Sequence, residues 1–360
     1  MADAASIARL RLIRTASIGP VTYRQLIARF GDAAAAIEAL PQLAARGGGR
    51  SPVVAAVAVA EREIATARKL GARHLFIDDA DYPELLAQLD DAPPALMVRG
   101  DVALLARDTV AMVGARNASA AACRFARQIA AELGREAVTV VSGLARGVDT
   151  AAHVGSIEGG TIGVIAGGID VVYPPENAEL QERIAREGLL VAEQPPGTEP
   201  RARHFPYRNR IIAGASLGTV VVEAAPRSGS LITARLAGEA GREVMAVPGS
   251  PLDPRAQGCN LLIREGATLV QTAADILEQI RPFAPRSVRA PTDLFIGPPP
   301  EDANDGDRRM IVALLGPVPV GIDELIRQSH LSPAIVQTVL LELELAGRLE
   351  RHAGGRVALG

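Results

Sequence analysis

Basic and aromatic side chains crowd into residues 201–210, which read RARHFPYRNR. The stretch holds four arginines, one histidine and two aromatic residues, and no carboxylate. Guanidinium groups bind phosphate oxygens through paired hydrogen bonds, and the ring of Phe205 or Tyr207 could stack on a nucleobase. The stretch therefore predicts a site for a polyanion. For Phe205 alone, a place in the hydrophobic core is the alternative interpretation.

Four glycine-containing turns follow apolar runs elsewhere in the chain and could hold the same anion. They comprise residues 114–117 with Arg116, residues 142–147 with Arg146, residues 167–168, and residues 227–230. In such turns the backbone N–H groups and a helix N-terminus can point at a phosphate. Ligands of parallel sheets bind outside the carboxyl ends of the strands. We therefore expect these turns to line one groove, although each turn alone could be only a structural turn.

Other chemistries lack their sequence signals. No GxGxxG with a later ribose-binding acid follows the first strand, and no GxxxxGK[ST] occurs, which disfavours dinucleotide and P-loop nucleotide binding. Asp149 and His153 lie four residues apart without a third ligand at a suitable spacing. We expect a helix-capping aspartate and a histidine that fixes the neighbouring turn. No Ser/His/Asp set suggests itself, so the sequence predicts neither catalysis nor a cofactor or metal.

The elements that must position these residues alternate between strand and helix. The short apolar runs TVAMVG, TVVSG, TIGVIAGG, LLVAE, GTVVVEA and EVMAVPG are separated by helical stretches. Continuous apolar strands between helices indicate a parallel sheet covered on both faces. The fold class is therefore α/β, with a doubly wound Rossmann-like sheet.

Smaller domains are predicted on both sides of this sheet. Residues 1–70 form a helical domain whose turn at 17–20 suggests a helix-hairpin-helix (SAM-like) unit, or a plain helical pair, and whose GGGR segment at 47–50 is expected to be flexible. Residues 71–281 form the extended Rossmann-like domain. Residues 282–307 are a proline-rich linker. Residues 308–360 predict three helices and a β-hairpin, the outline of a winged helix, with Ser332 and Pro333 starting the third helix.

The composition narrows the setting of the protein. The net charge is −3, so a polyanion site has to come from a local basic patch. Cys123 and Cys259 fit no metal-ligand spacing and are expected to be free, buried thiols in a reducing compartment. No basic-then-apolar leader opens the chain, and no apolar run reaches about 18 residues. We expect a soluble, cytoplasmic protein with no membrane contact.

Several ordered motifs then carry a family resemblance. They are SGLARGVDTAAH, GVIAGGIDVVYPPEN, AEQPPGTEPRARHFPYRNRIIAGAS, VVVEAAPRSGSLITARLAGEAGREVMAVPGS and QGCNLLIREGATLV. Together they closely resemble the DNA-processing protein A family (DprA, also called Smf) over about residues 110–280. The resemblance implies a non-enzymatic binder of single-stranded DNA that protects incoming DNA during natural transformation and loads the RecA recombinase. It also implies a homodimer formed through the Rossmann-like domain.

The resemblance places DNA contacts at Arg116, at the SGLARG and YPPEN turns, and at Arg208 and Arg210. With the turns above, the predicted DNA-binding residues are Gly114, Arg116, Ser142, Gly143, Arg146, Gly147, Asn177, Arg203, Phe205, Arg208, Asn209, Arg210, Ser228 and Gly229. One position departs from the pattern. Pro175 stands where we expect many relatives to carry a basic residue, and Arg146 or Arg203 could supply the charge instead.

Two other classes of protein compete with this interpretation. Residues 214–223, GASLGTVVVE, resemble the PGGxGTxxE signature of nucleotide phosphoribohydrolases of the lysine decarboxylase-like group, in which an Arg and the Glu serve hydrolysis. Here Ala215 and Ser216 replace two glycines, and Glu223 could simply brace the next turn. The third class is a regulator that binds duplex DNA through the winged helix. Residues 308–360 carry six arginines against five acids, so that domain is nearly neutral.

Overall fold

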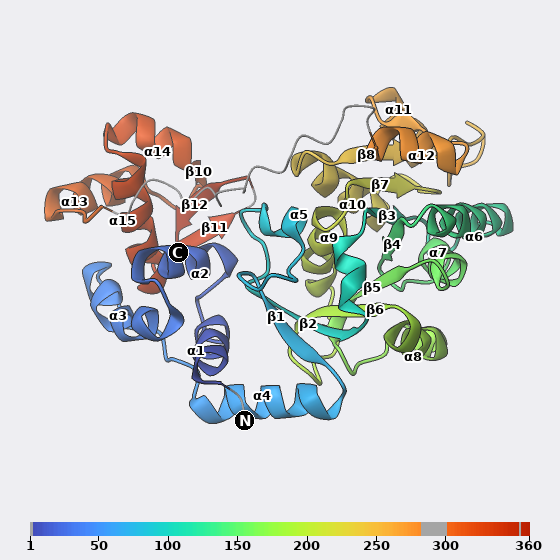
Figure 1. Ribbon diagram of the computed structural model, residues 1–360. Coiled ribbons are helices and arrows are strands. Elements are labelled where there is room, and N and C mark those ends of the chain that lie inside the picture. The colour runs from blue at the N-terminus through green and yellow to red at the C-terminus, as the bar shows by residue number, and fades with distance from the viewer. Residues whose placement is uncertain (1–2, 282–300, 353) are drawn as a thin grey trace. The chain divides into compact units, whose positions relative to one another are not determined.

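The computed structural model describes residues 3–281, 301–352 and 354–360. The chain divides into two compact units, residues 63–287 and residues 1–62 together with 288–360 (Figure 1). Residues 282–300 of the predicted proline-rich linker (282–307) lie outside the described residues. The predicted domain boundaries themselves stay predictions.

Residues 63–287 are built on one nine-stranded sheet. Its strands are β1 (Arg73–Phe76), β2 (Ala95–Gly100), β3 (Thr109–Val113), β4 (Thr139–Ser142), β5 (Thr161–Gly168), β6 (Leu189–Gln194), β7 (Gly218–Val221), β8 (Glu243–Ala246) and β9 (Thr268–Leu269). They lie in the order β1-β2-β6-β5-β4-β3-β7-β8-β9. The pairings from β6 to β9 are parallel, and β2 joins β1 and β6 antiparallel. The predicted doubly wound Rossmann-like sheet is confirmed.

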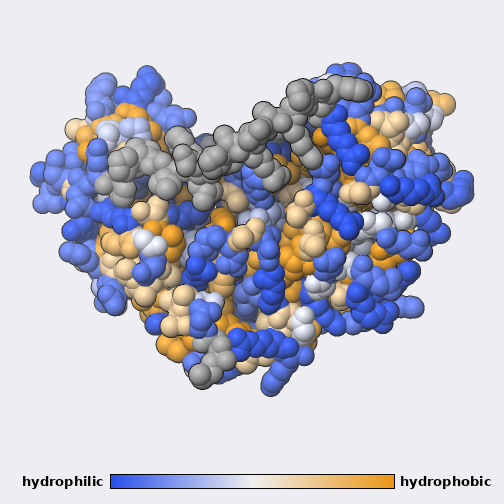
Figure 2. Space-filling view, viewed as in Figure 1, coloured by the Kyte–Doolittle hydropathy of each residue, from blue (hydrophilic) through white to orange (hydrophobic). Residues whose placement is uncertain are grey.

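Helices cover both faces of this sheet, as the continuous apolar strands require. The helices of this part of the chain are α4 (Val57–Lys69), α5 (Glu84–Ala87), α6 (Ala120–Arg135), α7 (Val148–Ser156), α8 (Ala178–Glu187), α9 (His204–Gly214), α10 (Gly229–Glu239), α11 (Gln257–Arg264) and α12 (Ala273–Ile280), with 3₁₀ turns at Val102–Ala106 and Pro175–Asn177. Met112 packs with Ile129 of α6 on one face, and Val113 packs with Ile212 of α9 on the other. Hydrophilic residues cover much of the outer surface around α6 and α8 (Figure 2).

Helix starts follow the predicted capping signals. The Ser119 hydroxyl accepts a hydrogen bond from the Ala122 N–H at 3.0 Å and caps α6. Cys259 is buried as expected, and burial raises the pKa of its thiol to about 11. Cys123, in contrast, is partly exposed on α6, so the expectation of two buried thiols is wrong for this residue.

The second unit combines both ends of the chain. Its N-terminal part holds α1 (Ala4–Ile13), α2 (Pro20–Phe30) and α3 (Ala33–Arg46), and its C-terminal part holds α13 (Asp305–Leu314), β10 (Val320–Gly321), α14 (Ile322–Ser329), α15 (Pro333–Leu345), β11 (Leu349–His352) and β12 (Arg356–Leu359). Three helices with a three-stranded sheet confirm the predicted winged helix. Ser332 caps α15 as predicted, accepting from the Ile335 N–H at 3.3 Å.

The glycine segment predicted to be flexible is instead the hydrogen-bonded end of α3. The Gly47 N–H donates to the Leu43 carbonyl at 3.1 Å, and the Gly49 N–H donates to the Ala44 carbonyl at 3.1 Å. A run of glycines indicates conformational freedom only when no neighbouring element approaches its backbone. Among the described residues, none of the helices is both long and apolar enough to cross a membrane.

Candidate nucleic-acid interface

A cavity of about 370 Å³ opens at the carboxyl ends of β3, β4 and β5. The loop after β3 contributes Arg116 and Asn117, the loop after β4 contributes Gly143, Ala145 and Arg146, the segment from β5 onward contributes residues from Ile165 to Pro175, and the approach to α9 with its first turns contributes Pro200, Phe205 and Arg208. The predicted basic stretch and three of the four predicted glycine turns therefore meet in one place. This is the position at which parallel α/β sheets bind their ligands.

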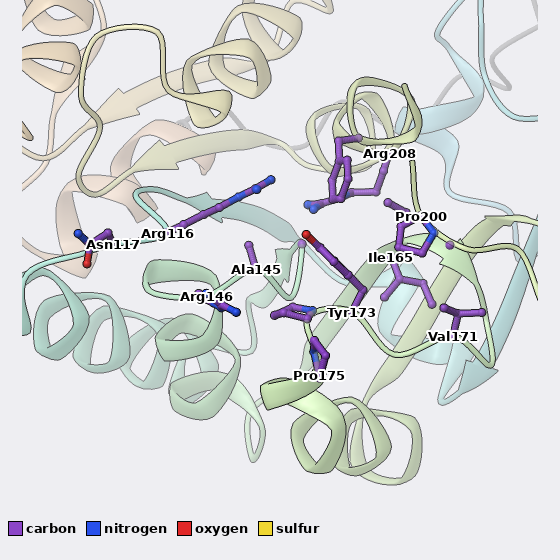
Figure 3. Close-up of a pocket in the computed structure, with 15 residues that line it drawn as sticks. Arg116, Asn117, Ala145, Arg146, Ile165, Val171, Tyr173, Pro175, Pro200 and Arg208 are labelled. Atoms are coloured by element: carbon purple, nitrogen blue, oxygen red, sulfur yellow. The ribbon is translucent and has the colours of Figure 1, made fainter. Parts of the chain in front are cut away.

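Two guanidinium groups and two aromatic rings converge inside the cavity. The guanidinium carbons of Arg116 and Arg208 lie 5.3 and 5.8 Å from the centre of the Phe205 ring. The Tyr173 ring lies 5.7 Å from the Phe205 ring at an interplanar angle of 60°. Figure 3 shows Arg116, Arg208 and Tyr173 pointing toward one another from three different segments. Phe205 is half-buried in this wall, so the cavity, and not the core, receives its ring.

Two buried groups of opposite charge, Arg208 of the cavity lining and Asp149 of α7, act on each other electrostatically. Arg208 is 7% exposed and Asp149 is 4% exposed. Burial raises the pKa of Asp149, and the positive charge of Arg208 opposes that shift. Burial likewise lowers the pKa of Arg208, and Asp149 opposes it. Each charge therefore partly offsets the cost of burying the other.

The same aspartate organises the turn after β4. Its carboxylate accepts hydrogen bonds from the backbone N–H groups of Gly143 at 3.1 Å and Ala145 at 3.3 Å. A Cβ atom at Gly143 would lie 1.4 Å from Nη1 of Arg208. Gly143 therefore makes room for a guanidinium of this chain, and the predicted backbone approach to a phosphate stays a prediction. The prediction of a helix-capping aspartate is wrong, because Asp149 lies inside the first turn of α7, whose N-cap is Gly147, and its carboxylate holds the turn after β4.

Three other predicted residues support the cavity from behind. Gly147 has φ +76°, and a Cβ atom there would lie 2.3 Å from the carbonyl oxygen of Ala115. Asn177 is buried and donates to the Leu144 carbonyl at 2.8 Å, which ties the YPPEN turn to the turn after β4. Ser142 donates to the Met112 carbonyl at 2.6 Å. These residues fix the shape of the walls.

The sequence predicted that His153 fixes the neighbouring turn, whereas its side-chain contact lies at the start of a strand. The imidazole is fully buried on α7, and its Nδ1 lies 2.7 Å from Oγ1 of Thr161 at the start of β5. Desolvation, with a smaller contribution from the charge of Arg208, lowers the pKa of His153 to about 3. The folded protein therefore keeps this imidazole neutral throughout the mildly acidic range.

This burial predicts a loss of stability in mild acid. Because an exposed histidine titrates near pH 6.5, the contribution of neutral His153 is complete above that pH and is lost as the pH falls toward 3. At about pH 5 this one group lowers the free energy of unfolding by about 2 kcal/mol. Urea unfolding at about pH 7.5 and pH 5 should show that decrease in the wild type and a smaller one in His153→Asn. Equal decreases in both proteins would contradict the assignment.

Several predicted contacts lie away from the cavity lining. Arg210 is buried in pairing with Glu193 and donates to the backbone carbonyl of Asp91. Arg203 is exposed and Asn209 is partly exposed, and neither belongs to the lining. Their predicted DNA contacts remain predictions, and for Arg210 the structure gives a structural role. Arg146 does line the cavity and pairs with Glu176 at its rim.

The fourth glycine turn is not part of this cavity. Ser228 caps α10 by accepting from the Ser230 N–H at 3.4 Å, and Gly229 begins that helix. Gly114 packs below the lining, where a Cβ atom would lie 2.5 Å from Val148. Within the described ranges, no cluster of His, Cys, Asp or Glu has the arrangement of a metal site.

Glu223 braces two loops. Its carboxylate accepts from the Ser119 N–H at 2.8 Å and lies 3.8 Å from Nε of Arg255. The side chain is largely buried in these contacts. The sequence left open that Glu223 braces the next turn, and the contacts show bracing of two more distant segments instead.

Tyr173 belongs to the predicted YPPEN turn but was not among the individually predicted DNA-binding residues. It is 47% exposed in the cavity wall and contacts Phe205. An available signal was the aromatic residue directly before Pro174 and Pro175, in a turn that follows a long apolar strand. Pro175 also lines the cavity, at the position where a basic residue was expected.

The doubly wound sheet and this cavity define a Rossmann-like protein that presents arginines and aromatic rings at its ligand-binding edge, a combination typical of nucleic-acid-binding sites. The family model for DNA recombination-mediator protein A matches residues 73–281. A DprA-like N-terminal HHH domain matches residues 3–66, and a DprA winged helix domain matches residues 297–355. The chain belongs to the DprA/Smf family of DNA processing proteins.

Individual relatives agree with this assignment. DNA processing protein DprA of Bacillus subtilis is 43% identical over 222 residues, covering 61% of this chain and 75% of the relative. Protein Smf of Escherichia coli is 39% identical over 299 residues, covering 79% and 77%. The crystal structure of DprA from Streptococcus pneumoniae superposes with a TM-score of 0.59 at 39% identity, covering 68% of this chain and 81% of that one. DprA from Helicobacter pylori gives a TM-score of 0.53 at 27% identity, covering 57% and 95%.

Proposed function

We propose that the chain binds single-stranded DNA without catalysing a reaction, and that the cavity at the carboxyl edge is part of the binding site. The observation that carries this proposal is the cluster of Arg116, Arg208, Phe205 and Tyr173. Arginines hold phosphates, and aromatic rings stack on bases of any type, which suits an unpaired strand. The structure of the Helicobacter pylori relative is described as one of a single-stranded DNA binding mode, which supports the same ligand class here.

The biological role follows from the family. We propose that the protein protects incoming DNA during natural transformation and DNA recombination, and that it loads the RecA recombinase onto the strand. Support comes from the matched family, whose description is DNA recombination-mediator protein A. The RecA step rests on the family resemblance.

We also propose a homodimer formed through the Rossmann-like domain. The edge strand β9 and the neighbouring α11 carry apolar side chains on the surface: Leu261 is 38% exposed and Leu269 is 44% exposed, and Leu252, before α11, is 92% exposed. An edge strand offers unpaired backbone groups to a second chain. Apolar residues gathered next to such an edge support a protein contact there.

A nucleotide phosphoribohydrolase is the competing function. Glu223 would have to act in hydrolysis, yet its carboxylate is engaged by the Ser119 N–H and by Arg255. This bracing supports a non-catalytic role. Incubation with nucleoside monophosphates separates the two functions, because sustained release of free base would overturn the non-catalytic proposal.

Binding can be measured by fluorescence anisotropy with single- and double-stranded oligonucleotides over a series of salt concentrations. We expect preference for the single strand, and an affinity that falls by roughly 0.7 log units per log unit of salt for each phosphate contacted. Equal affinity for both forms, or no dependence on salt, would contradict the proposed site.

A further inference from the structure

In a winged helix that binds duplex DNA, one helix enters the major groove. The corresponding helix of this chain lacks the basic side chains that such binding needs. In helix-turn-helix proteins the second helix of the motif enters the major groove, and α15 holds that position after α14. Its sequence, PAIVQTVLLELEL, contains no lysine or arginine and two glutamates. A duplex presents phosphates on both sides of its groove, and bound proteins neutralise them with basic residues. An apolar and acidic helix fits a protein surface better.

Side chains on two faces of α15 are buried. Val336, Val339, Leu340 and Leu343 pack into the core of the winged helix. Thr338, Leu341 and Leu345 lie outside that core, on a second stripe with helical spacing, and are 4%, 3% and 1% exposed. From the N-terminal helical domain, α3 packs against α15.

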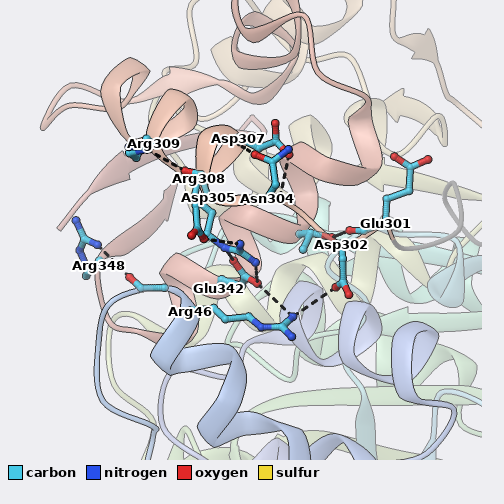
Figure 4. A network of polar contacts seen from close by, with 12 residues as sticks. Arg46, Glu301, Asp302, Asn304, Asp305, Asp307, Arg308, Arg309, Glu342 and Arg348 are labelled. Carbon is cyan, nitrogen blue, oxygen red and sulfur yellow. Dashed lines mark hydrogen bonds and ion pairs between the residues drawn. The ribbon is translucent and has the colours of Figure 1, made fainter.

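A buried carboxylate links the two domains. Glu342 of α15 is fully buried and accepts from Nε and Nη2 of Arg308 at 2.8 and 2.9 Å. Nη1 of Arg46, at the end of α3, lies 3.9 Å from the same carboxylate and 3.4 Å from Asp302 (Figure 4). A buried carboxylate needs compensating charge, and here one of its two partners comes from the N-terminal domain.

Further polar contacts follow the same seam. Gln25 of α2 donates to the side chain of Gln337 at 2.8 Å, and Arg29 donates to Oγ1 of Thr338 at 3.3 Å. Arg348, just after α15, donates to the Gly47 carbonyl at 3.0 Å. The seam therefore combines hydrogen bonds and charged contacts with buried side chains, as specific protein interfaces do.

The glycines after α3 allow the close approach of the two domains. A Cβ atom at Gly47 would lie 2.0 Å from the Glu342 carbonyl oxygen, and one at Gly49 would lie 2.2 Å from the Ala346 carbonyl oxygen. Gly47 has φ −71° and ψ −3°, a conformation open to any residue. Glycine is needed there for the contact with α15 and not for the backbone angle.

We propose that the C-terminal winged helix is a protein-docking module and not a reader of duplex DNA, and that its resident partner is the N-terminal helical domain of the same chain. The two ends of the chain then form one composite module, with α15 as the docking helix. This inference is independent of the single-strand site, which lies in residues 63–287.

Cross-linking in the full-length chain tests the docking. The parent protein carries Gln25→Cys and Gln337→Cys, with the partly exposed Cys123 replaced by serine, and is treated with a short bismaleimide. We expect a linked peptide joining positions 25 and 337 in a product of monomer mass. Adding Gly47→Ala and Gly49→Ala should lower the yield of this product at least tenfold. The control Gly19→Ala, at a glycine with open space around it, should leave the yield unchanged.

The outcomes separate the alternatives. Absence of the linked peptide in the parent, or its formation only between two copies, would overturn docking within one chain. An undiminished yield in the double glycine variant would overturn the assigned seam. Affinity for duplex DNA should be equal in the parent and the double glycine variant, whereas a tenfold gain in the variant would identify α15 as a masked DNA reader and overturn the docking role. The affinity for single-stranded DNA is measured in the same variants. An unchanged value shows that residues 63–287 remain folded.

Discussion

Arg208→Ala should lower the free energy of unfolding by about 1–3 kcal/mol, the range for leaving a buried polar group less well compensated. The guanidinium of Arg208 is 7% exposed beside the Gly143 turn, and its charge opposes the burial-driven rise in the pKa of Asp149. Without it, the Asp149 carboxylate stays buried and keeps the hydrogen bonds from two backbone N–H groups, which carry no full charge. Chemical denaturation at neutral pH measures the decrease in stability.

The matched test is the Asp149→Asn change in the same background. Asparagine removes the uncompensated charge, so the double variant should recover part of the stability that Arg208→Ala loses. A double-mutant cycle would then give a coupling energy well above the few tenths of a kcal/mol expected for independent sites. Strict additivity of the two changes would show that the two charges do not depend on each other.

Phe205→Ala should weaken binding of single-stranded DNA by roughly 5- to 150-fold, because a base stacked on an aromatic ring contributes about 1–3 kcal/mol. Phe205 is half-buried and contacts Arg116, Arg208 and Tyr173, so its removal takes away the centre of the cluster. Arg116→Ala should weaken binding as well, and should reduce the salt dependence by roughly 0.7 log units for each phosphate that this guanidinium neutralises. Anisotropy titrations over a salt series measure both quantities.

Arg235→Ala is the control for charge alone. Arg235 lies exposed on α10 and pairs with Glu239 at 3.6 Å. Its removal changes the net charge by the same amount as Arg116→Ala and should leave affinity and salt dependence nearly unchanged. If all three variants behaved alike, the DNA would be held by general electrostatics and the cavity would not be the site.

Local signals explain why the fold was predictable from the sequence. Continuous apolar runs separated by helical stretches are the pattern of a sheet buried on both faces, and the nine-stranded sheet follows it. Ser119, and Ser332 with Pro333, begin helices at the predicted places because a capping side chain acts on residues two or three positions away. The meeting of the turns after β3, β4 and β5 was predictable because parallel strands end at one edge.

The division of labour among the arginines was not predictable in this way. Arg208 and Arg210 are two positions apart, which places them on different sides of α9. One therefore lines the cavity and the other pairs with Glu193. Both arginines lie in the same short basic stretch. Their roles differ because different segments of the folded chain lie next to each of them. Tyr173 became part of the site in the same way, through its contact with Phe205.

The sequence by itself determined the parallel sheet, the winged helix, the helix caps and the edge of the sheet where an anion would bind, because each depends on periodicity or on residues a few positions apart. Tertiary structure alone decided which arginines face the cavity, that Gly143 makes room for Arg208, and that Gly47 and Gly49 meet α15. Those contacts join segments far apart in the chain. A single residue carries no local signal for a partner that only folding brings near it.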